Sequence, residues 1–116
     1  MRENRRELGG RKERTAGAYL EEKGHVILAY NYRTRMAEAD VVSKDGDTYV
    51  FTEVKYRSGS AQGHPLEAVT PAKQRKVRMA ALYYLEDRNL SPDLTPVRFD
   101  VIGILGDSLT HVENAF

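Results

Sequence analysis

The residues of this sequence best suited to chemistry are an aspartate and a nearby Glu-x-Lys triplet, Asp40 with Glu53 and Lys55. Mg²⁺ takes one or two carboxylates in proteins and keeps several of its waters. A lysine beside the metal-bound water can orient that water and offset charge while a phosphodiester is attacked. The pattern therefore indicates hydrolysis of nucleic-acid phosphodiesters that depends on Mg²⁺ or Mn²⁺, with Asp40 and Glu53 as metal ligands.

A predicted β-hairpin must bring these residues together. Its strands, residues 39–42 and 48–54, are joined through the dipeptide Asp45-Gly46. Asp-Gly between apolar runs is a strong hairpin signal, because a type I′ turn needs positive φ at both central residues. We therefore expect Asp45 and Gly46 to form a two-residue turn.

That turn fixes which residues of the hairpin face each other. It places Asp40 opposite Phe51 and Glu38 opposite Glu53. Because the side chains of a strand alternate between its two faces, the acids and Lys55 are predicted to share one face. The alternative is that Glu-x-Lys belongs to an exposed strand face on which charges simply alternate.

A predicted second helix supplies further candidates. Thr70 is its expected N-cap and Pro71 its first residue. Gln74 falls on the inward side, three residues before Val77. Its amide either points into the site or caps a loop carbonyl, and both readings stay open.

Positive charge is concentrated around this helix. Between Lys55 and Arg78 there are six basic residues and one acidic residue, although the net charge of the chain is only +1. Such a segment can form a phosphate-binding face, and a solvated helix surface is the alternative. The candidates for nucleic-acid binding are Arg57, Lys73, Arg75, Lys76 and Arg78.

The remaining pattern predicts an α/β domain with the element order αβββαββ. Residues 1–10 are expected to form a flexible basic arm, and residues 11–113 a single domain. The apolar stripe of the second helix is Val77, Ala81, Tyr84 and Leu85. In chain order, we expect a helix at 11–23 ended by Gly24, strands at 26–32, 39–42 and 48–54, a helix from Pro71 to about Arg88, and strands at 97–105 and 109–112.

Composition narrows the class of protein. Of 116 residues, 41% are apolar and 30% are charged, an ordinary globular balance, and cysteine is absent. The lack of cysteine fits a reducing compartment and removes thiolate zinc sites. Apolar runs are far shorter than the ~20 residues of a membrane span. We therefore expect a cytoplasmic protein without a membrane partner. The three histidines are scattered, as is typical of surface or loop residues, and receive no role.

These residues also carry a family resemblance. Between about Leu8 and Ile104 the sequence resembles the YraN-like family of uncharacterised bacterial proteins, which are grouped by fold with restriction endonucleases and Holliday-junction resolvases. The matching segments include Glu13 with Ala16 and Tyr19-Leu20, Asn31-Tyr32-Arg33, Glu38-Ala39-Asp40, Phe51-Thr52-Glu53-Val54-Lys55-Tyr56-Arg57, Gly63 with Pro65, Lys73-Gln74 and Arg98-Phe99-Asp100-Val101.

The resemblance implies a restriction-endonuclease-like core with a mixed sheet flanked by helices. It implies that Asp40 and Glu53 bind the metal, that Lys55 is the catalytic lysine, and that Glu13 and Gln74 belong to the site. The expected activity is a Mg²⁺-dependent endonuclease acting on branched or structured DNA, rather than RNA, and a homodimer is left open. The alternatives are a nucleic-acid-binding module of the same fold without turnover, and a protein-interaction domain with a vestigial site.

Overall fold

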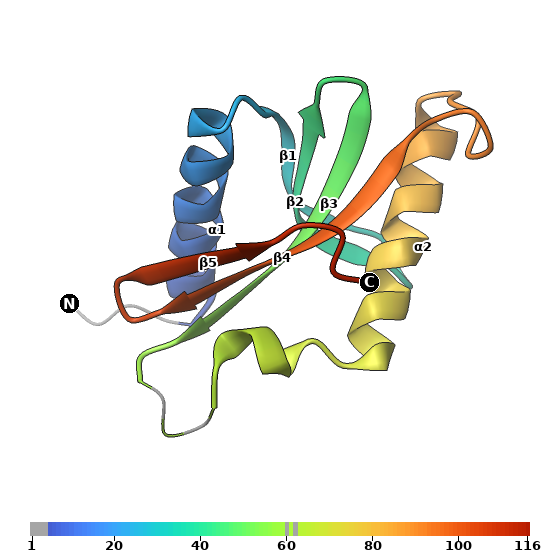
Figure 1. Cartoon of the computed structure of the whole chain (residues 1–116). Coiled ribbons are helices and arrows are strands. Elements are labelled where there is room, and N and C mark those ends of the chain that lie inside the picture. The colour runs from blue at the N-terminus through green and yellow to red at the C-terminus, as the bar shows by residue number, and fades with distance from the viewer. Residues whose placement is uncertain (1–4, 60, 62) are drawn as a thin grey trace.

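A computed structural model of the chain describes residues 5–59, 61 and 63–116. Two helices lie on opposite faces of a five-stranded mixed sheet (Figure 1). The elements are α1 (Arg5–Glu22), β1 (Val26–Arg33), β2 (Glu38–Asp45), β3 (Thr48–Arg57), the short 3₁₀ helix η2 (Pro65–Ala68), α2 (Pro71–Asp87), β4 (Val97–Leu105) and β5 (Ser108–Val112). The α/β class and the order αβββαββ are confirmed, with η2 added inside the loop before α2. Within the described residues, no helix is both long and apolar enough to cross a membrane.

The two helices begin and end largely where local signals place them. Thr70 caps α2 by accepting a hydrogen bond from the Lys73 N–H at 3.2 Å, and Pro71 is the first helical residue. Gly24, two residues after the end of α1, adopts φ +97°, which few other residues tolerate. However, α1 begins at Arg5 and not at Arg11. Residues 5–10 are therefore helical, and residues 1–4 of the expected arm lie outside the described part of the chain.

The sheet has the strand order β1-β2-β3-β4-β5. Its strands pair antiparallel except for β3 and β4, which run parallel. A parallel pair needs a long crossover, because the chain must return to the start of the sheet before the next strand begins. Here η2 and α2 provide that crossover, between the end of β3 at Arg57 and the start of β4 at Val97.

Each helix covers a separate apolar cluster. On one face, α1 packs Ala16 and Leu20 against Val41 and Ile102. On the other face, the buried stripe of α2 contacts β2 and β3, and its largest side chain, Tyr84, meets the ring of Phe51 edge-on at 5.7 Å. The predicted inward residues Val77, Ala81, Tyr84 and Leu85 are all buried. The predicted amphipathic packing of α2 is confirmed.

The predicted register of the hairpin is wrong by two residues. Asp45 pairs with Thr48 and remains in the strand, so that Gly46 and Asp47 form the turn. Gly46 has φ +60°, while Asp47 has no positive φ, which is the signature of a type II′ rather than a type I′ turn. Consequently Val42, and not Asp40, lies opposite Phe51. A shift of two residues preserves the side-chain faces, whereas a shift of one would have exchanged them.

The prediction that the three histidines are surface or loop residues is wrong for two of them. His111 binds the fully buried carboxylate of Asp100 at 2.7 Å, and Arg98 binds the same carboxylate at 2.9 Å. His25 is buried and lies 2.9 Å from the hydroxyl of Ser43. These contacts form a structural network of ion pairs and hydrogen bonds on the sheet. Only His64 behaves as expected, because it caps η2 from a loop.

Candidate active site

Carboxylates gather where the ladder between β2 and β3 ends. The last pair of that ladder is Val41 with Thr52. Just beyond it, Asp40 Oδ2 accepts a hydrogen bond from the backbone N–H of Val54 at 2.8 Å. The side chain of Asp40 therefore binds a backbone group that lies past the end of the ladder. Glu53, beside Val54, is only 1% exposed, and Asp40 is 9% exposed.

Two further contacts join acids at this point. The carboxyl groups of Asp40 and Glu53 lie near enough for each to influence the pKa of the other. Glu13 reaches the same place from α1, where its carboxyl group lies beside Asp40 and the side chain of Asn31. Asn31 holds φ +52° within β1, a conformation that asparagine tolerates better than most residues. Three acids from three separate elements thus converge on one buried point.

Burial makes this cluster costly to ionise. Burial, followed by the nearby charge of Asp40, raises the pKa of Glu53 to about 7. Burial also raises the pKa of Asp40, against the opposing effect of the Val54 N–H. The pKa of Glu13 rises for the same main reason. Adjacent carboxylates in a low-dielectric site favour uptake of a proton or of another cation.

Two buried carboxylate oxygens of this cluster also lack a hydrogen-bond donor. When all three acids are ionised, none has a proton to donate to another. Glu13 Oε2 and Glu53 Oε2 are buried without a hydrogen-bond partner among the described residues. Buried polar atoms without partners are uncommon and point to a missing proton, water or ion.

Two lysines partly offset the charge of Glu53. Glu53 Oε1 lies 3.4 Å from Lys55 Nζ and 3.3 Å from Lys73 Nζ. Lys73 Nζ also donates to Glu38 Oε1 at 2.9 Å, and Arg33 binds the other oxygen of Glu38. Burial opposes the charge of Lys73, but the bonds to Glu38 and Glu53 outweigh it and raise the pKa of Lys73. The lysine is therefore a permanent cation of the site.

The structure brings together most of the site predicted from the sequence. Asp40, Glu53 and Lys55 are adjacent, and Glu13, which only the family resemblance singled out, lies beside Asp40. Gln74 behaves according to the simpler of its two readings, because its amide donates to the loop carbonyl of Val69 at 3.3 Å.

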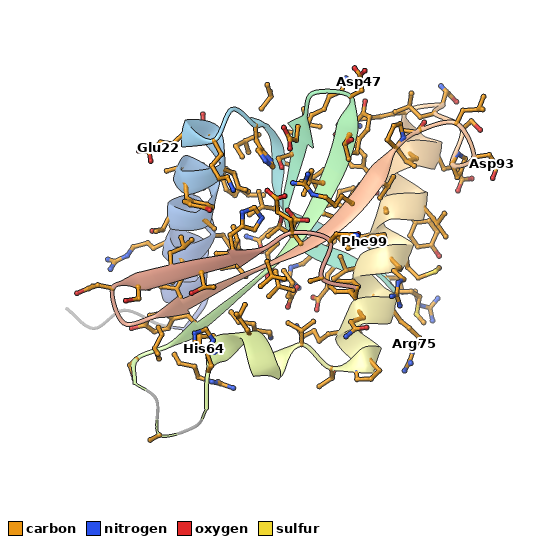
Figure 2. The ribbon with its side chains drawn as sticks, in the orientation of Figure 1. Glu22, Asp47, His64, Arg75, Asp93 and Phe99 are labelled. Atoms are coloured by element: carbon orange, nitrogen blue, oxygen red, sulfur yellow. The ribbon has the colours of Figure 1, made fainter. Side chains whose placement is uncertain are left out.

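The predicted phosphate-binding cations divide into three groups. Lys73 is occupied by carboxylates inside the acid site. Arg75, Lys76 and Arg78 are exposed on α2, and Arg75 projects away from the sheet (Figure 2). The fifth candidate, Arg57 at the end of β3, is only partly exposed, and its buried Nε has no partner among the described residues.

Sequence reasoning placed Glu38 on the predicted face of the site without giving it a role, and it assigned Lys73 to phosphate binding rather than to the acid cluster. A signal for Lys73 was present, because it lies one helical turn before the buried Val77 on the inward stripe of α2. Its cationic side chain concealed this position, since lysine in a helix usually faces solvent. Glu38 shares β2 with Asp40, but its partners Arg33 and Lys73 become apparent only from the packing of α2 on the sheet.

The donor set fits a Mg²⁺ site that substrate completes. Within the described residues, no group of three or more His, Cys, Asp or Glu side chains is arranged to hold a metal ion. Mg²⁺ does not need such a group, because it commonly uses one or two carboxylates together with waters and substrate phosphates. The buried, unpartnered Oε2 of Glu53 beside Asp40 is a suitable donor pair. These two residues would hold the ion.

Comparison with known proteins agrees with the family resemblance. Residues 12–104 match the uncharacterised protein family UPF0102. A UPF0102 protein of Lachnoclostridium phytofermentans is 44% identical over 113 residues, which cover 97% of this chain and 95% of that protein. A UPF0102 protein of Desulforapulum autotrophicum is 40% identical over all of this chain and 98% of its own length. The chain therefore belongs to the uncharacterised protein family UPF0102, the YraN family expected from its sequence.

Proposed function

We propose that this protein is a Mg²⁺-dependent endonuclease that hydrolyses phosphodiesters of branched or structured DNA. The observation that carries this proposal is the convergence of Glu13, Asp40 and Glu53 at the end of the β2–β3 ladder, with Lys55 beside them. A structural role explains this cluster poorly, because burying several acids together costs free energy that apolar residues would not. A site that binds a cation and phosphate oxygens gives the arrangement a use.

Each side chain has a role that follows from its contacts. Asp40 and Glu53 hold the ion, and Glu13 supports Asp40 as an accessory acid. Lys55, 3.4 Å from Glu53, offsets the negative charge that develops on the attacked phosphate. Lys73 ties Glu53 to Glu38 and so fixes the carboxylate in position. When bound, Mg²⁺ supplies Lewis-acid polarisation of the phosphoryl group and an activated water.

The test is cleavage of defined DNA by wild type and Asp40→Asn. A four-way junction, a splayed duplex and a linear duplex of matched sequence are incubated with Mg²⁺, with Mn²⁺ or with EDTA. We expect metal-dependent nicking that falls by on the order of 100-fold or more in the variant, because several kcal/mol of transition-state stabilisation depends on the metal. The matched control is Asp93→Asn, in the exposed loop after α2 (Figure 2). Identical products from wild type and Asp40→Asn would rule out the proposed site.

Metal binding provides a readout independent of turnover. Titration calorimetry with Mn²⁺ should detect binding to wild type that Asp40→Asn loses and Asp93→Asn retains. Sedimentation of the junction complex tests whether two copies act together, since a homodimer would present two equivalent sites to a symmetric junction.

A second function is favoured by one specific observation. Both Lys55 and Lys73 approach the same oxygen of Glu53, so part of the site's charge is offset without a metal. A nucleic-acid-binding module without turnover would bind DNA with an affinity that falls steeply as salt rises, and would cleave with no metal. Neutralising Arg75, Lys76 and Arg78 together should then weaken binding, and unchanged affinity would remove this alternative. A protein-interaction domain would bind neither DNA nor divalent ions.

A further inference from the structure

A small pocket lies at the turn between β1 and β2. It has a volume of ≈ 90 Å³ and is lined by residues 33–38 and by Lys76 of α2. The turn is tight, because the N–H of Thr34 donates to the carbonyl of Ala37 at 2.9 Å. Arg35 and Met36 therefore form its tip, where both are exposed. This volume is below the roughly 300–1,000 Å³ of drug-sized sites, which suits a single anionic group belonging to a longer ligand.

The pocket carries an excess of positive charge. Its lining includes three cations, Arg33, Arg35 and Lys76, and one acid, Glu38. Glu38 already binds Arg33. Neither Arg35 nor Lys76 lies within ion-pair distance of an acid among the residues that the structure describes, and the positive charge of Lys76 helps to lower the pKa of Glu38. These two cations are therefore available to a bound anion, and an arginine can contact a phosphate through two parallel hydrogen bonds.

The pocket is connected to the acid site by ion pairs. Glu38 lines the pocket, and its Oε1 lies 2.9 Å from Lys73 Nζ, which is in turn 3.3 Å from Glu53. Along β2, Glu38 and Asp40 are two residues apart, a separation of roughly 7 Å at the usual strand rise. A nucleic-acid strand with a rise of about 3.4 Å per nucleotide covers that distance in about two nucleotides.

The exposed side chain of Met36 favours a nucleotide over free phosphate as the source of the bound anion. Its side chain is 64% exposed beside the cations of the pocket. Free phosphate offers nothing apolar for this side chain to contact, whereas a nucleotide offers a sugar and a base. Apolar side chains that contact bases next to phosphate-binding arginines or lysines are common in proteins that distort DNA.

We propose that this pocket is a subsite for a backbone phosphate that lies about two nucleotides along the strand from the phosphodiester in the acid site. The inference rests on the proposed nuclease function. Arg35 and Lys76 bind the phosphate, while Glu38 holds Arg33 at the wall of the pocket. Met36 packs against the adjoining sugar or base. The turn thus fixes the position of the strand relative to Asp40 and Glu53.

The experiment measures binding without cleavage. Fluorescence anisotropy with a labelled single-stranded oligonucleotide in EDTA compares wild type with the double variant Arg35→Gln/Lys76→Gln over a range of salt concentrations. Removing the cations that neutralise one phosphate lowers the slope of log K against log salt by about 0.7, so the double variant should bind more weakly and with a slope smaller by about that amount. Met36→Ala should weaken oligonucleotide binding about three-fold, because it loses part of one apolar contact, without changing the slope.

The control removes the same charge elsewhere. Lys44→Gln/Arg88→Gln neutralises two cations, one near the β2–β3 turn and one at the carboxyl-terminal cap of α2. Equal losses in the two double variants, or wild-type affinity and slope in Arg35→Gln/Lys76→Gln, would overturn the subsite. Because EDTA is present, the subsite is upheld by its binding data even if wild type cleaves no DNA. Conversely, cleavage that depends on Asp40 together with unchanged binding by the double variant would reject the subsite alone.

Discussion

Replacing Glu53 by glutamine removes the carboxyl group whose ionisation is most strongly opposed by its surroundings. Its pKa is raised from 4.5 to about 7 by burial and by Asp40. Between these pH values the folded protein keeps a proton that the unfolded chain has already released. Raising the pH through this window therefore favours the unfolded state, and the free energy of unfolding falls. Glu53→Gln has no such proton to lose and should escape this fall.

The size of the effect follows from the two pKa values. One pH unit between folded and unfolded pKa values corresponds to about 1.4 kcal/mol, so the full window is worth roughly 3 kcal/mol. That is a large share of a typical domain stability of about 5–15 kcal/mol. The pKa of about 7 for Glu53 already includes the attraction of Lys55 and Lys73, because both lysines lower it. We therefore expect Glu53→Gln to exceed wild type by up to roughly 3 kcal/mol at pH 8 and by much less at pH 4.5.

The assay is urea denaturation followed by circular dichroism at several pH values between 4.5 and 8, without divalent ions. Other titrating groups, such as His25 and Asp100, are common to both proteins, so the difference between them isolates the acid cluster. Addition of Mg²⁺ at pH 8 should stabilise wild type by about 1.4 kcal/mol at a concentration ten times its Kd, and should leave Glu53→Gln unchanged. A difference between the proteins that is constant with pH, or that shrinks as the pH rises, would refute the reasoning.

Two further predictions concern stability away from the acid site. Asp100→Asn should cost about 3–5 kcal/mol at pH 7, because Arg98 loses a buried partner. Burial opposes the charge of Asp100, but its hydrogen bonds from His111 and Arg98 lower its pKa. Wild type therefore loses its extra stability over Asp100→Asn as the pH falls through the pKa of Asp100. Urea denaturation should show the difference in unfolding free energy between the two proteins shrinking in acid. Gly17→Ala should cost about 1–3 kcal/mol by overpacking, because the new methyl carbon would lie 2.0 Å from the hydroxyl of Tyr30. In Gly10→Ala, where nothing lies within 4 Å, helix propensity alone should raise the melting temperature; equal melting temperatures for the two variants would contradict this.

Features that depend on neighbouring residues in the chain could be read from the sequence. Thr70-Pro71 defines the start of α2, because an N-cap hydroxyl and a fixed φ act within one helical turn. The stripe of α2 follows from helical periodicity, and its buried residues are those expected. Strand existence and element order came from β-rich runs separated by turn signals, which are likewise local.

The hairpin register needed contacts that the sequence does not reveal. An Asp-Gly pair can form the centre of a type I′ turn, or can supply a strand residue followed by the glycine of a type II′ turn. In this protein, contacts of Asp45 with residues distant in the chain select the type II′ turn. Asp45 stays in β2, where its carboxylate lies 3.1 Å from Arg98 on β4 and 3.6 Å from His25. Both partners are distant in sequence, so local turn chemistry alone gave the wrong answer.

The sequence by itself determined which residue types were available for the candidate site and, through side-chain alternation, that Glu53 and Lys55 share a face. Tertiary structure decided the rest. Docking α1 on one face of the sheet brings Glu13 to Asp40, and docking α2 on the other brings Lys73 to Glu53 and Glu38. Such contacts arise from burial of apolar stripes that lie far apart in the chain, and burial fixes positions that no local pattern encodes.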